Sequence, residues 1–347
     1  MTHIEVRNDA AANRVTIADV AALADVSVPT VSRVLTGAAK VSRVRRERVE
    51  RAIAELSFRP SAAARALASR RPQVIAIIAG DTSQYGYAEA IRGVEESARA
   101  SGYTVMITVV ESNDDAVVEK AIAATLSQSL AGIIVLKFDP PGVAALAQMP
   151  HEVPIVALSG VRDTSVPQAV IDETRAAEEL TNYLLDLGHA TVHHVRVPAS
   201  RREDGRTTGW RRALRTAGRD VPVILDATWD PHSGVAVGAG IAASRDVTAV
   251  FCGNDEIAMG VIRGITDAGL SVPEDISVVG FDDHPLAALW SPPLTTVDQD
   301  FARLGRRGFS LMLAEIAGEA TRKYSSERPP VVVRQSAAAP SRTRGGA

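Results

Sequence analysis

Two hydrophobic patterns divide the chain. Between residues 16 and 57, apolar residues recur every three or four positions, which predicts two short helices within 16–36 and a third helix over 42–57. From residue 74 onward, short apolar runs alternate with longer amphipathic segments, a pattern typical of parallel sheets with helices on both faces. The expected fold is therefore α/β, with a helical head followed by two doubly wound α/β lobes and a cleft between them.

The second pattern also predicts the individual elements of the lobes. The apolar runs expected to form buried strands cover residues 74–79, 104–109, 132–136, 155–158, 168–171, 193–197, 249–252 and 276–281. The amphipathic segments expected to form helices lie near residues 87–101, 114–129, 174–187, 207–217, 233–245 and 255–269. In open sheets of this kind, ligands bind at the carboxyl ends of the strands.

Region 16–36 has the features of a helix-turn-helix. Thr16 can cap the first helix, and Asp19 then stands near its positive end. A polar turn at 25–27 follows, and Pro29 falls in the first turn of the second helix, where a missing N–H costs little. The side chains left on the outer face of the second helix are Val28, Pro29, Ser32 and Arg33. In a helix-turn-helix, the second helix enters the major groove of DNA. The alternative is an amphipathic helix pair that only packs within the protein and does not bind DNA.

The outer residues suggest two kinds of DNA contact. The guanidinium of Arg33 has a fixed fork of donors and can bind guanine O6 and N7 in the major groove. The short hydroxyl side chains are suited to phosphate contacts, which set the register without reading sequence; they are Thr16, Thr30 and Ser32.

The charge is unevenly distributed between the two parts of the chain. Residues 1–71 carry 13 Lys and Arg against 7 Asp and Glu, a balance of +6, so the remaining residues carry −9 of the overall −3. A basic head on an acidic body suits a polyanion-binding module attached to a sensor domain. A solvated charged helix at 43–51 is the alternative explanation for the excess of arginine.

The chain resembles the lactose/galactose repressor (LacI/GalR) family of bacterial transcription regulators over roughly residues 15–336. The matching residues are Val15-Thr16-Ile17-x-Asp19-Val20-Ala21, Val26-Ser27-x-x-Thr30-Val31-Ser32-Arg33-Val34 and Arg59-Pro60-Ser61-x-x-Ala64-Arg65-x-Leu67. The resemblance implies that the lobes have the periplasmic-binding-protein type I fold, which this family uses to sense small molecules.

The resemblance also assigns roles in DNA recognition. Val28 and Pro29 occupy the two positions with which the family selects its operator, and both are apolar here, so they would read thymine methyl groups or DNA shape. The short Ala-rich segment 61–69 would be a hinge helix that folds when paired with its twin on DNA. Within it, Leu67 matches the residue that family members insert into the minor groove. Ser61 and Arg65 are the other expected DNA contacts of this segment.

For the effector, the resemblance points to positions that line the cleft. Arg206 matches a ligand-binding arginine, and Trp229 matches an aromatic residue that stacks on a sugar face. Asn254 and Asp282 each follow a buried strand, where polar groups suit a hydroxyl-rich ligand. The remaining expected effector contacts are Tyr85, Tyr87, Ser159 and Phe301.

Two departures from the family pattern keep the ligand class open. Ser159-Gly160 stands where the lactose repressor has an acidic residue that holds galactoside hydroxyls. The segment 80–87 lacks the Asn-Pro-Phe of many relatives. A sugar is expected from Arg206 and Trp229, and a purine or another metabolite is the alternative. Release of DNA by the ligand is favoured over corepression.

Other function classes fit the sequence less well. A transporter's solute-binding protein would share the body but needs a signal peptide, which the N-terminus lacks, and it has no use for residues 15–67. An enzyme is disfavoured because no phosphate-binding glycine motif or nucleophile–base pair stands out. A single cysteine, Cys252, excludes a multi-cysteine metal site. We therefore expect no catalytic residue, no metal and no cofactor in a cytoplasmic homodimer that binds operator DNA and does not contact the membrane.

The expected domain organisation has five parts. Residues 1–14 form a disordered tail, 15–60 the DNA-binding head, 61–72 the hinge helix and linker, 73–337 the two-lobed effector-binding and dimerisation core, and 338–347 a second disordered tail.

Overall fold

The computed structural model describes residues 15–35, 41–58, 72–150, 152–162, 166–198, 204–319 and 324–341. They belong to two compact units, a head within residues 1–73 and a core within residues 74–347. The expected hinge helix and both outer tails, apart from residues 338–341, lie outside the described residues.

The head consists of three short helices around a small apolar core. They are α1 (Ile17–Leu23), α2 (Val28–Leu35) and α3 (Arg43–Glu55). Val20, Val31 and Val49, one from each helix, are fully buried in this core. The turn between α1 and α2 bends at Asp25, whose φ is +49°. Arg48 of α3 holds this turn, because it contacts both the carboxylate of Asp25 at 2.7 Å and its carbonyl oxygen at 3.0 Å.

The first lobe of the core is a six-stranded parallel sheet with helices on both faces. Its strands are ordered β11-β5-β4-β3-β1-β2. Its elements are β1 (Val74–Ala79), α5 (Tyr85–Ala100), β2 (Thr104–Val109), α6 (Asp115–Leu126), β3 (Gly132–Lys137), α7 (Pro140–Ala147), β4 (Ile155–Ser159), β5 (Gln168–Ile171), α12 (Phe301–Ala317) and β11 (Tyr324–Glu327).

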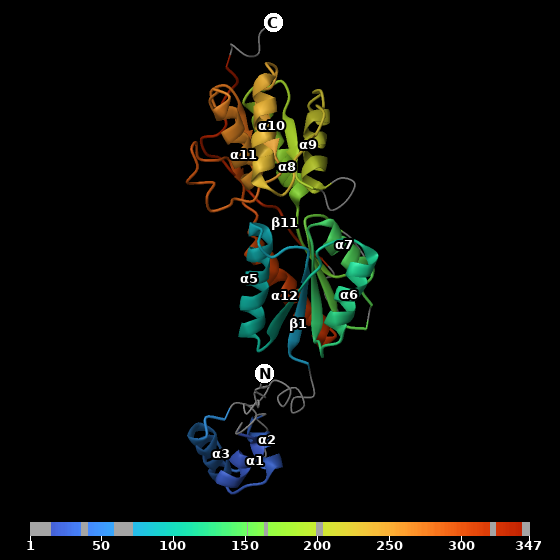
Figure 1. The fold of residues 1–347 in the computed structure, drawn as a ribbon, viewed down its shortest axis with the longest axis vertical. Helices are drawn as coiled ribbons and strands as arrows, with labels where there is room; N and C mark the ends of the chain where they lie inside the picture. The colour runs from blue at the N-terminus through green and yellow to red at the C-terminus, as the bar shows by residue number, and fades with distance from the viewer. Residues whose placement is uncertain are drawn as a thin grey trace, which may run out of the picture. The chain divides into compact units, whose positions relative to one another are not determined.

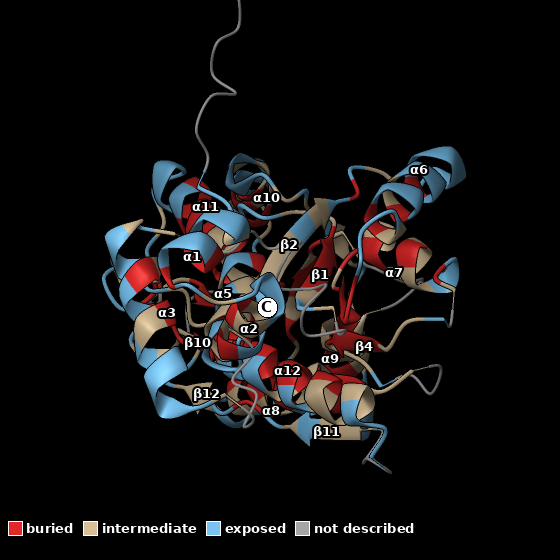
Figure 2. Cartoon of the chain, turned by 90° about the horizontal axis from the view of Figure 1, so that it is seen from below, coloured by how far each residue is buried: buried red, intermediate tan, exposed pale blue. Residues whose placement is uncertain are grey.

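Alternation along β1 shows why this sheet is covered on both sides. Ile75 and Ile77 face the cluster built with α5 and α12, while Ala76 and Ile78 face the cluster built with α6 and α7. Figure 1 shows these two helix layers on opposite faces. In Figure 2, β1 is buried along most of its length, whereas the edge strand β2 is only partly covered.

The second lobe repeats this plan with a smaller sheet of order β7-β6-β8-β9. Helices α8 and α9 pack on one face and α10 and α11 on the other. Its elements are α8 (Glu173–Asp186), β6 (His193–Arg196), α9 (Gly205–Thr216), β7 (Leu225–Asp226), α10 (Pro231–Ala243), β8 (Ala249–Cys252), α11 (Asp255–Asp267) and β9 (Ser277–Val279), beside the two-stranded sheet of β10 (Thr296–Val297) and β12 (Val331–Val332).

The chain crosses between the lobes three times. It leaves the first lobe after β5, returns from β10 to α12, and leaves again from β11 to β12. Helix α12 therefore belongs to the first lobe, where it packs along α5. Three adjacent crossovers join two bodies whose cores are separate, which is the construction expected of a hinge.

The structure confirms the predicted alternation of strands and helices and adds elements that the pattern did not predict. The additions are α7, β7, β10, α12, β11 and β12. In α12 the face toward the first lobe contains Gly305 and Gly308, which lower helix propensity and interrupt the apolar repeat. The predicted disordered tail also begins too early: the backbone N–H of Ala338 donates to Ser277 Oγ, and its carbonyl accepts from the same hydroxyl and contacts His189 Nε2 at 3.0 Å.

Candidate functional site

The outer face of α2 carries the side chains expected to meet DNA. Val28, Pro29 and Arg33 are exposed, while Val31 and Val34 on the opposite face are buried. Thr30 is half-buried, and its hydroxyl lies 2.9 Å from that of Ser27. The helix thus presents one contact face, as a recognition helix requires.

Thr16 has a structural task at the start of α1. Its hydroxyl donates to Asp19 at 2.7 Å, and the Asp19 N–H contacts the same hydroxyl at 3.4 Å. The Thr16 N–H also donates to the Asp19 carboxylate at 2.7 Å, which completes a capping box. These hydrogen bonds lower the pKa of Asp19. A phosphate contact by Thr16 stays a prediction, as does that of Ser32.

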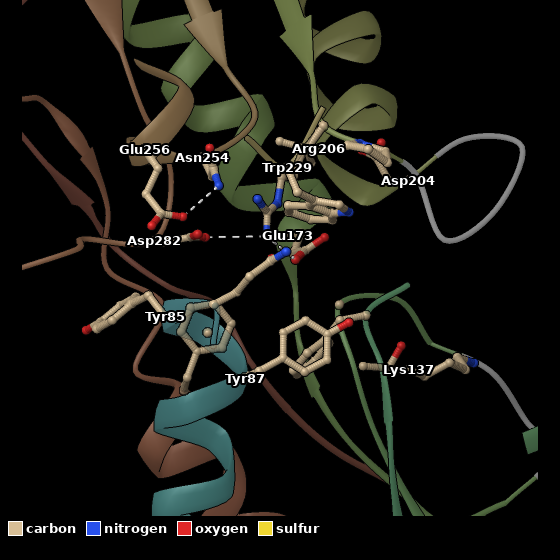
Figure 3. Close-up of a pocket in the computed structure, with 18 of the residues that line it drawn as sticks. Tyr85, Tyr87, Lys137, Glu173, Asp204, Arg206, Trp229, Asn254, Glu256 and Asp282 are labelled. Carbon is tan, nitrogen blue, oxygen red and sulfur yellow. Dashed lines mark hydrogen bonds and ion pairs between the residues drawn. The ribbon is translucent and has the colours of Figure 1, made fainter. Parts of the chain in front are cut away.

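The core contains a pocket between the two lobes, at the carboxyl ends of their strands. The space between the lining side chains amounts to about 810 Å³, including open solvent at its mouth. All eight residues predicted to contact the effector line it, and they come from both lobes: Tyr85, Tyr87, Ser159, Arg206, Trp229, Asn254, Asp282 and Phe301. Figure 3 labels six of them around the cavity: Tyr85, Tyr87, Arg206, Trp229, Asn254 and Asp282.

Arg206 is the centre of a buried charge cluster. Its Nη2 lies 3.0 Å from Glu173 Oε1 and 3.4 Å from Asp282 Oδ1, and its Nη1 donates to the carbonyl of Gly253. The guanidinium also lies over the ring of Phe281, 4.7 Å from the centroid. Both terminal nitrogens are thus engaged by protein, so Arg206 orders the pocket in addition to any contact with a ligand.

Asp282 is held in a backbone conformation that residues other than glycine rarely adopt, with φ at +119°. Gln299 Nε2 donates to its carboxylate at 2.7 Å, and Arg206 faces the same oxygen. Burial raises the pKa of Asp282 to about 7, although Arg206 opposes the rise. Backbone strain of this kind is tolerated only where the surrounding structure enforces it.

Two tyrosines of the first lobe line the pocket. The Tyr87 hydroxyl donates to the buried Asp139 at 2.5 Å, and burial beside that carboxylate raises the pKa of Tyr87. Tyr85 lies against His284 of the second lobe, with ring centroids 4.8 Å apart, and against Phe301. Burial raises the pKa of Tyr85 to about 12, so both phenols stay neutral hydrogen-bonding groups at neutral pH.

Two other predicted residues have part of their polar atoms engaged. Asn254 caps α11 by accepting from the Ile257 N–H at 2.9 Å. The Ser159 hydroxyl donates to the Val161 carbonyl at 2.8 Å and accepts from its N–H at 3.1 Å. Ser159 thus shapes the loop after β4.

Comparisons with known proteins agree with this architecture. Residues 16–61 match the family described as bacterial regulatory proteins, lacI family, and residues 181–337 match a periplasmic binding protein-like domain. Catabolite control protein A of Priestia megaterium is 33% identical over 308 residues, which are 86% of this chain and 91% of that protein. The chain belongs to the lacI family. The HTH-type transcriptional repressor PurR of Vibrio campbellii (strain ATCC BAA-1116), a lacI-type relative, is 31% identical over 330 residues, 92% of this chain and 97% of that protein.

Solved structures extend the lacI-family likeness to both units. The Lac repressor dimer bound to operator and the anti-inducer ONPF has a TM-score of 0.86 at 28% identity, over 94% of this chain and all of that chain. A CelR–cellobiose complex has a TM-score of 0.67 at 28% identity, over 93% of this chain and all of that chain. This lacI-family protein is a DNA-binding transcription regulator, and the names of its relatives describe regulators rather than enzymes.

Some of the predictions for this lacI-family chain fall outside the described residues, and others can be examined only within them. Ser61, Arg65 and Leu67 lie outside the described residues, so their DNA contacts stay predictions. No helix in the described ranges is long and apolar enough to cross a bilayer. Within the same ranges, no group of His, Cys, Asp and Glu has the arrangement of a metal site.

The pocket of this lacI-family regulator also contains residues that the sequence did not single out. They include the charged and aromatic side chains of Lys137, Phe138, Glu173, Asp204 and Glu256. Lys137 ends the apolar strand β3 and is only 4% exposed, so it was hidden in an apolar run. Glu173 is the first residue of α8 and is separated from the end of β5 only by Asp172, the N-cap of that helix. The strand-end rule that found Asp282 would therefore also have found Glu173.

Proposed function

We propose that this lacI-family regulator represses genes of sugar uptake or catabolism and that a sugar in the pocket between the lobes releases it from operator DNA. The observation that supports this most strongly is the convergence of Trp229, Asn254 and Asp282 on one pocket. An indole ring offers an apolar plane for a sugar face, and amide and carboxylate groups bond hydroxyls. A sugar offers both an apolar ring face and hydroxyl groups; a purine could also stack on the indole and bond the same polar groups, so purines are included in the test below.

Two relatives support the assignment. The CelR structure contains cellobiose, and the Lac repressor structure contains a dimer on operator DNA with ONPF. By analogy, we propose that this chain acts as a homodimer whose two heads occupy adjacent half-sites of a palindromic operator in the cytoplasm. The core would bind the sugar and would not catalyse a reaction.

The proposed mechanism is linkage between two binding sites. The three crossovers between the lobes allow the pocket to close around a sugar, and this change alters how well the heads fit the operator. Coupling of this kind is typically worth about 1–3 kcal/mol, or roughly 5- to 150-fold in operator affinity. Because coupling is reciprocal, operator DNA should weaken sugar binding by the same factor.

The test uses the full chain and an operator identified by genome-wide footprinting. Fluorescence anisotropy of that operator is measured with cellobiose, lactose, glucose, galactose and maltose, and with hypoxanthine, guanine and amino acids for comparison. We expect at least one sugar to release the DNA. Trp229→Ala should abolish this release and keep operator binding, whereas the control His232→Ala, at a side chain on α10 that is 91% exposed, should behave as wild type. Release by a purine or an amino acid without any sugar response would refute the proposal.

A further inference from the structure

Gly160 and Glu173 meet where the two lobes approach each other. Gly160 follows β4 of the first lobe, and Glu173 begins α8 of the second. A Cβ atom placed on Gly160 would lie 2.5 and 2.6 Å from the two carboxylate oxygens of Glu173. Real side chains never approach so closely, so the Glu173 carboxylate occupies the space into which a side chain at position 160 would project.

The Glu173 carboxylate has one oxygen committed and one available. Its Oε1 accepts from Arg206 at 3.0 Å. Its Oε2 has no hydrogen bond to any of the described residues, and it lies near Gly205, where again no side chain covers it. Figure 3 shows this carboxylate near the centre of the pocket, close to Arg206 and Trp229. The Glu173 side chain is 12% exposed, so this oxygen is accessible from the pocket and a hydroxyl of an entering ligand can take the place of water on it.

The charges around the pocket favour an uncharged ligand. Four carboxyl groups line it, at Glu173, Asp204, Glu256 and Asp282, against the two cations Lys137 and Arg206. Burial raises the pKa of Asp282 to about 7, so this group is only partly ionised at neutral pH, and burial also raises the pKa of Glu173, against the opposing effect of Arg206. The Arg206 guanidinium is already compensated by Glu173 and Asp282. A phosphate or carboxylate placed beside Trp229 would therefore face like charges at short range, where the low dielectric of the site strengthens the repulsion.

We propose that Glu173 selects a neutral, hydroxyl-rich effector: its Oε2 accepts a hydrogen bond from an effector hydroxyl, and its charge excludes sugar phosphates and sugar acids. This inference rests on the proposed sugar effector. It also explains why a glycine stands at position 160: the absence of a side chain there leaves room for the carboxylate of Glu173 from α8.

The experiment is calorimetry of the full-length protein with matched sugars. Glucose, galactose and cellobiose are each compared with the corresponding 6-phosphate and uronic acid. The wild type should bind at least one neutral sugar at least tenfold more tightly than its two anionic derivatives. E173Q keeps the shape and one oxygen acceptor but loses the charge; it should weaken the neutral sugar about tenfold and reduce the discrimination against its anionic derivatives. G160A, which displaces the carboxylate, should weaken the same sugar.

A matched control lies on the same helix. Glu179 pairs with Arg328 at 2.8 Å and does not line the pocket, so E179Q should leave sugar affinity and discrimination unchanged. Operator binding without sugar reports whether each variant is folded. The ratio of the affinities for a neutral sugar and its anionic derivatives is measured on the wild type, so this part of the test does not depend on any variant.

The outcomes separate the two proposals. Binding of a neutral sugar with unchanged affinity and discrimination in E173Q would overturn the role of Glu173 and leave the sugar regulator standing. Tighter binding of a 6-phosphate or uronic acid by the wild type would overturn the charge argument. Binding of none of these sugars would overturn both the proposed function and the selection that depends on it.

Discussion

Replacing Gly238 with alanine tests how closely α10 and α11 are packed. A Cβ at this position would lie 3.0 Å from the carbonyl carbon and Cα of Val261 in α11, and closer still to the carbonyl oxygen. All of these atoms belong to the backbone of a helix, so they cannot move aside as a flexible side chain would. The two helices must separate, and the apolar contacts between them are then lost.

The magnitude follows from two opposing effects. Overpacking of a close-packed interior costs typically about 1–3 kcal/mol, and alanine in place of glycine returns up to about 1 kcal/mol of helix propensity. We expect Gly238→Ala to destabilise the core by a net of about 1–2 kcal/mol, by the same estimates. The matched control is Gly240→Ala on the same helix, where no atom lies within 4 Å of the added Cβ. Only the propensity gain then remains, so this variant should be more stable than wild type.

The assay is urea unfolding of the full chain, followed by circular dichroism through the transition of the core. Identical chemical changes two residues apart should give free energies of unfolding that differ from wild type in opposite directions. Equal effects of the two substitutions, or stabilisation by Gly238→Ala, would refute the reasoning from helix contact.

The remaining predictions concern DNA, pH and assembly. Arg33→Ala should weaken operator binding by about 1–3 kcal/mol and relax the preference for guanine at one position; anisotropy with operator variants checks this, and unchanged affinity would exclude the contact. Burial raises the pKa of Asp255 to about 6 from an ordinary 3.8, so the folded state binds more protons than the unfolded state and stability falls as pH rises from about 4 to 6. Asp255→Asn should remove this fall, on the order of 2 kcal/mol, in urea unfolding at pH 4 and pH 7; a parallel fall in both proteins would assign it elsewhere. Light scattering should give the mass of two chains, because a palindromic operator requires a two-fold dimer; a tetramer would reveal a second interface between copies of the chain.

The local sequence determined much of this protein. The helices of the head could be predicted from the spacing of apolar residues such as Val20, Val31 and Val34, which are buried in its core. Helix periodicity and capping depend on residues that are neighbours along the chain. The apolar runs from β1 to β9 were equally readable, since strands covered on both faces need continuous hydrophobicity. The same rule placed Asn254 and Asp282 at strand ends, and the structure brings both to the pocket.

Contacts between distant segments decided the rest. Helix α12 packs so closely on α5 that Gly305 is required, because a Cβ there would overlap the carbonyl oxygen of Ala90. This glycine weakens the periodic pattern of its own helix. The pocket's central carboxylate comes from Glu173, against a glycine at position 160, so an acidic group reaches the neighbourhood of Ser159 from helix α8. Periodicity reports what lies next along the chain. The distance between two backbones depends on the packing of the whole core, and only the tertiary structure contains it.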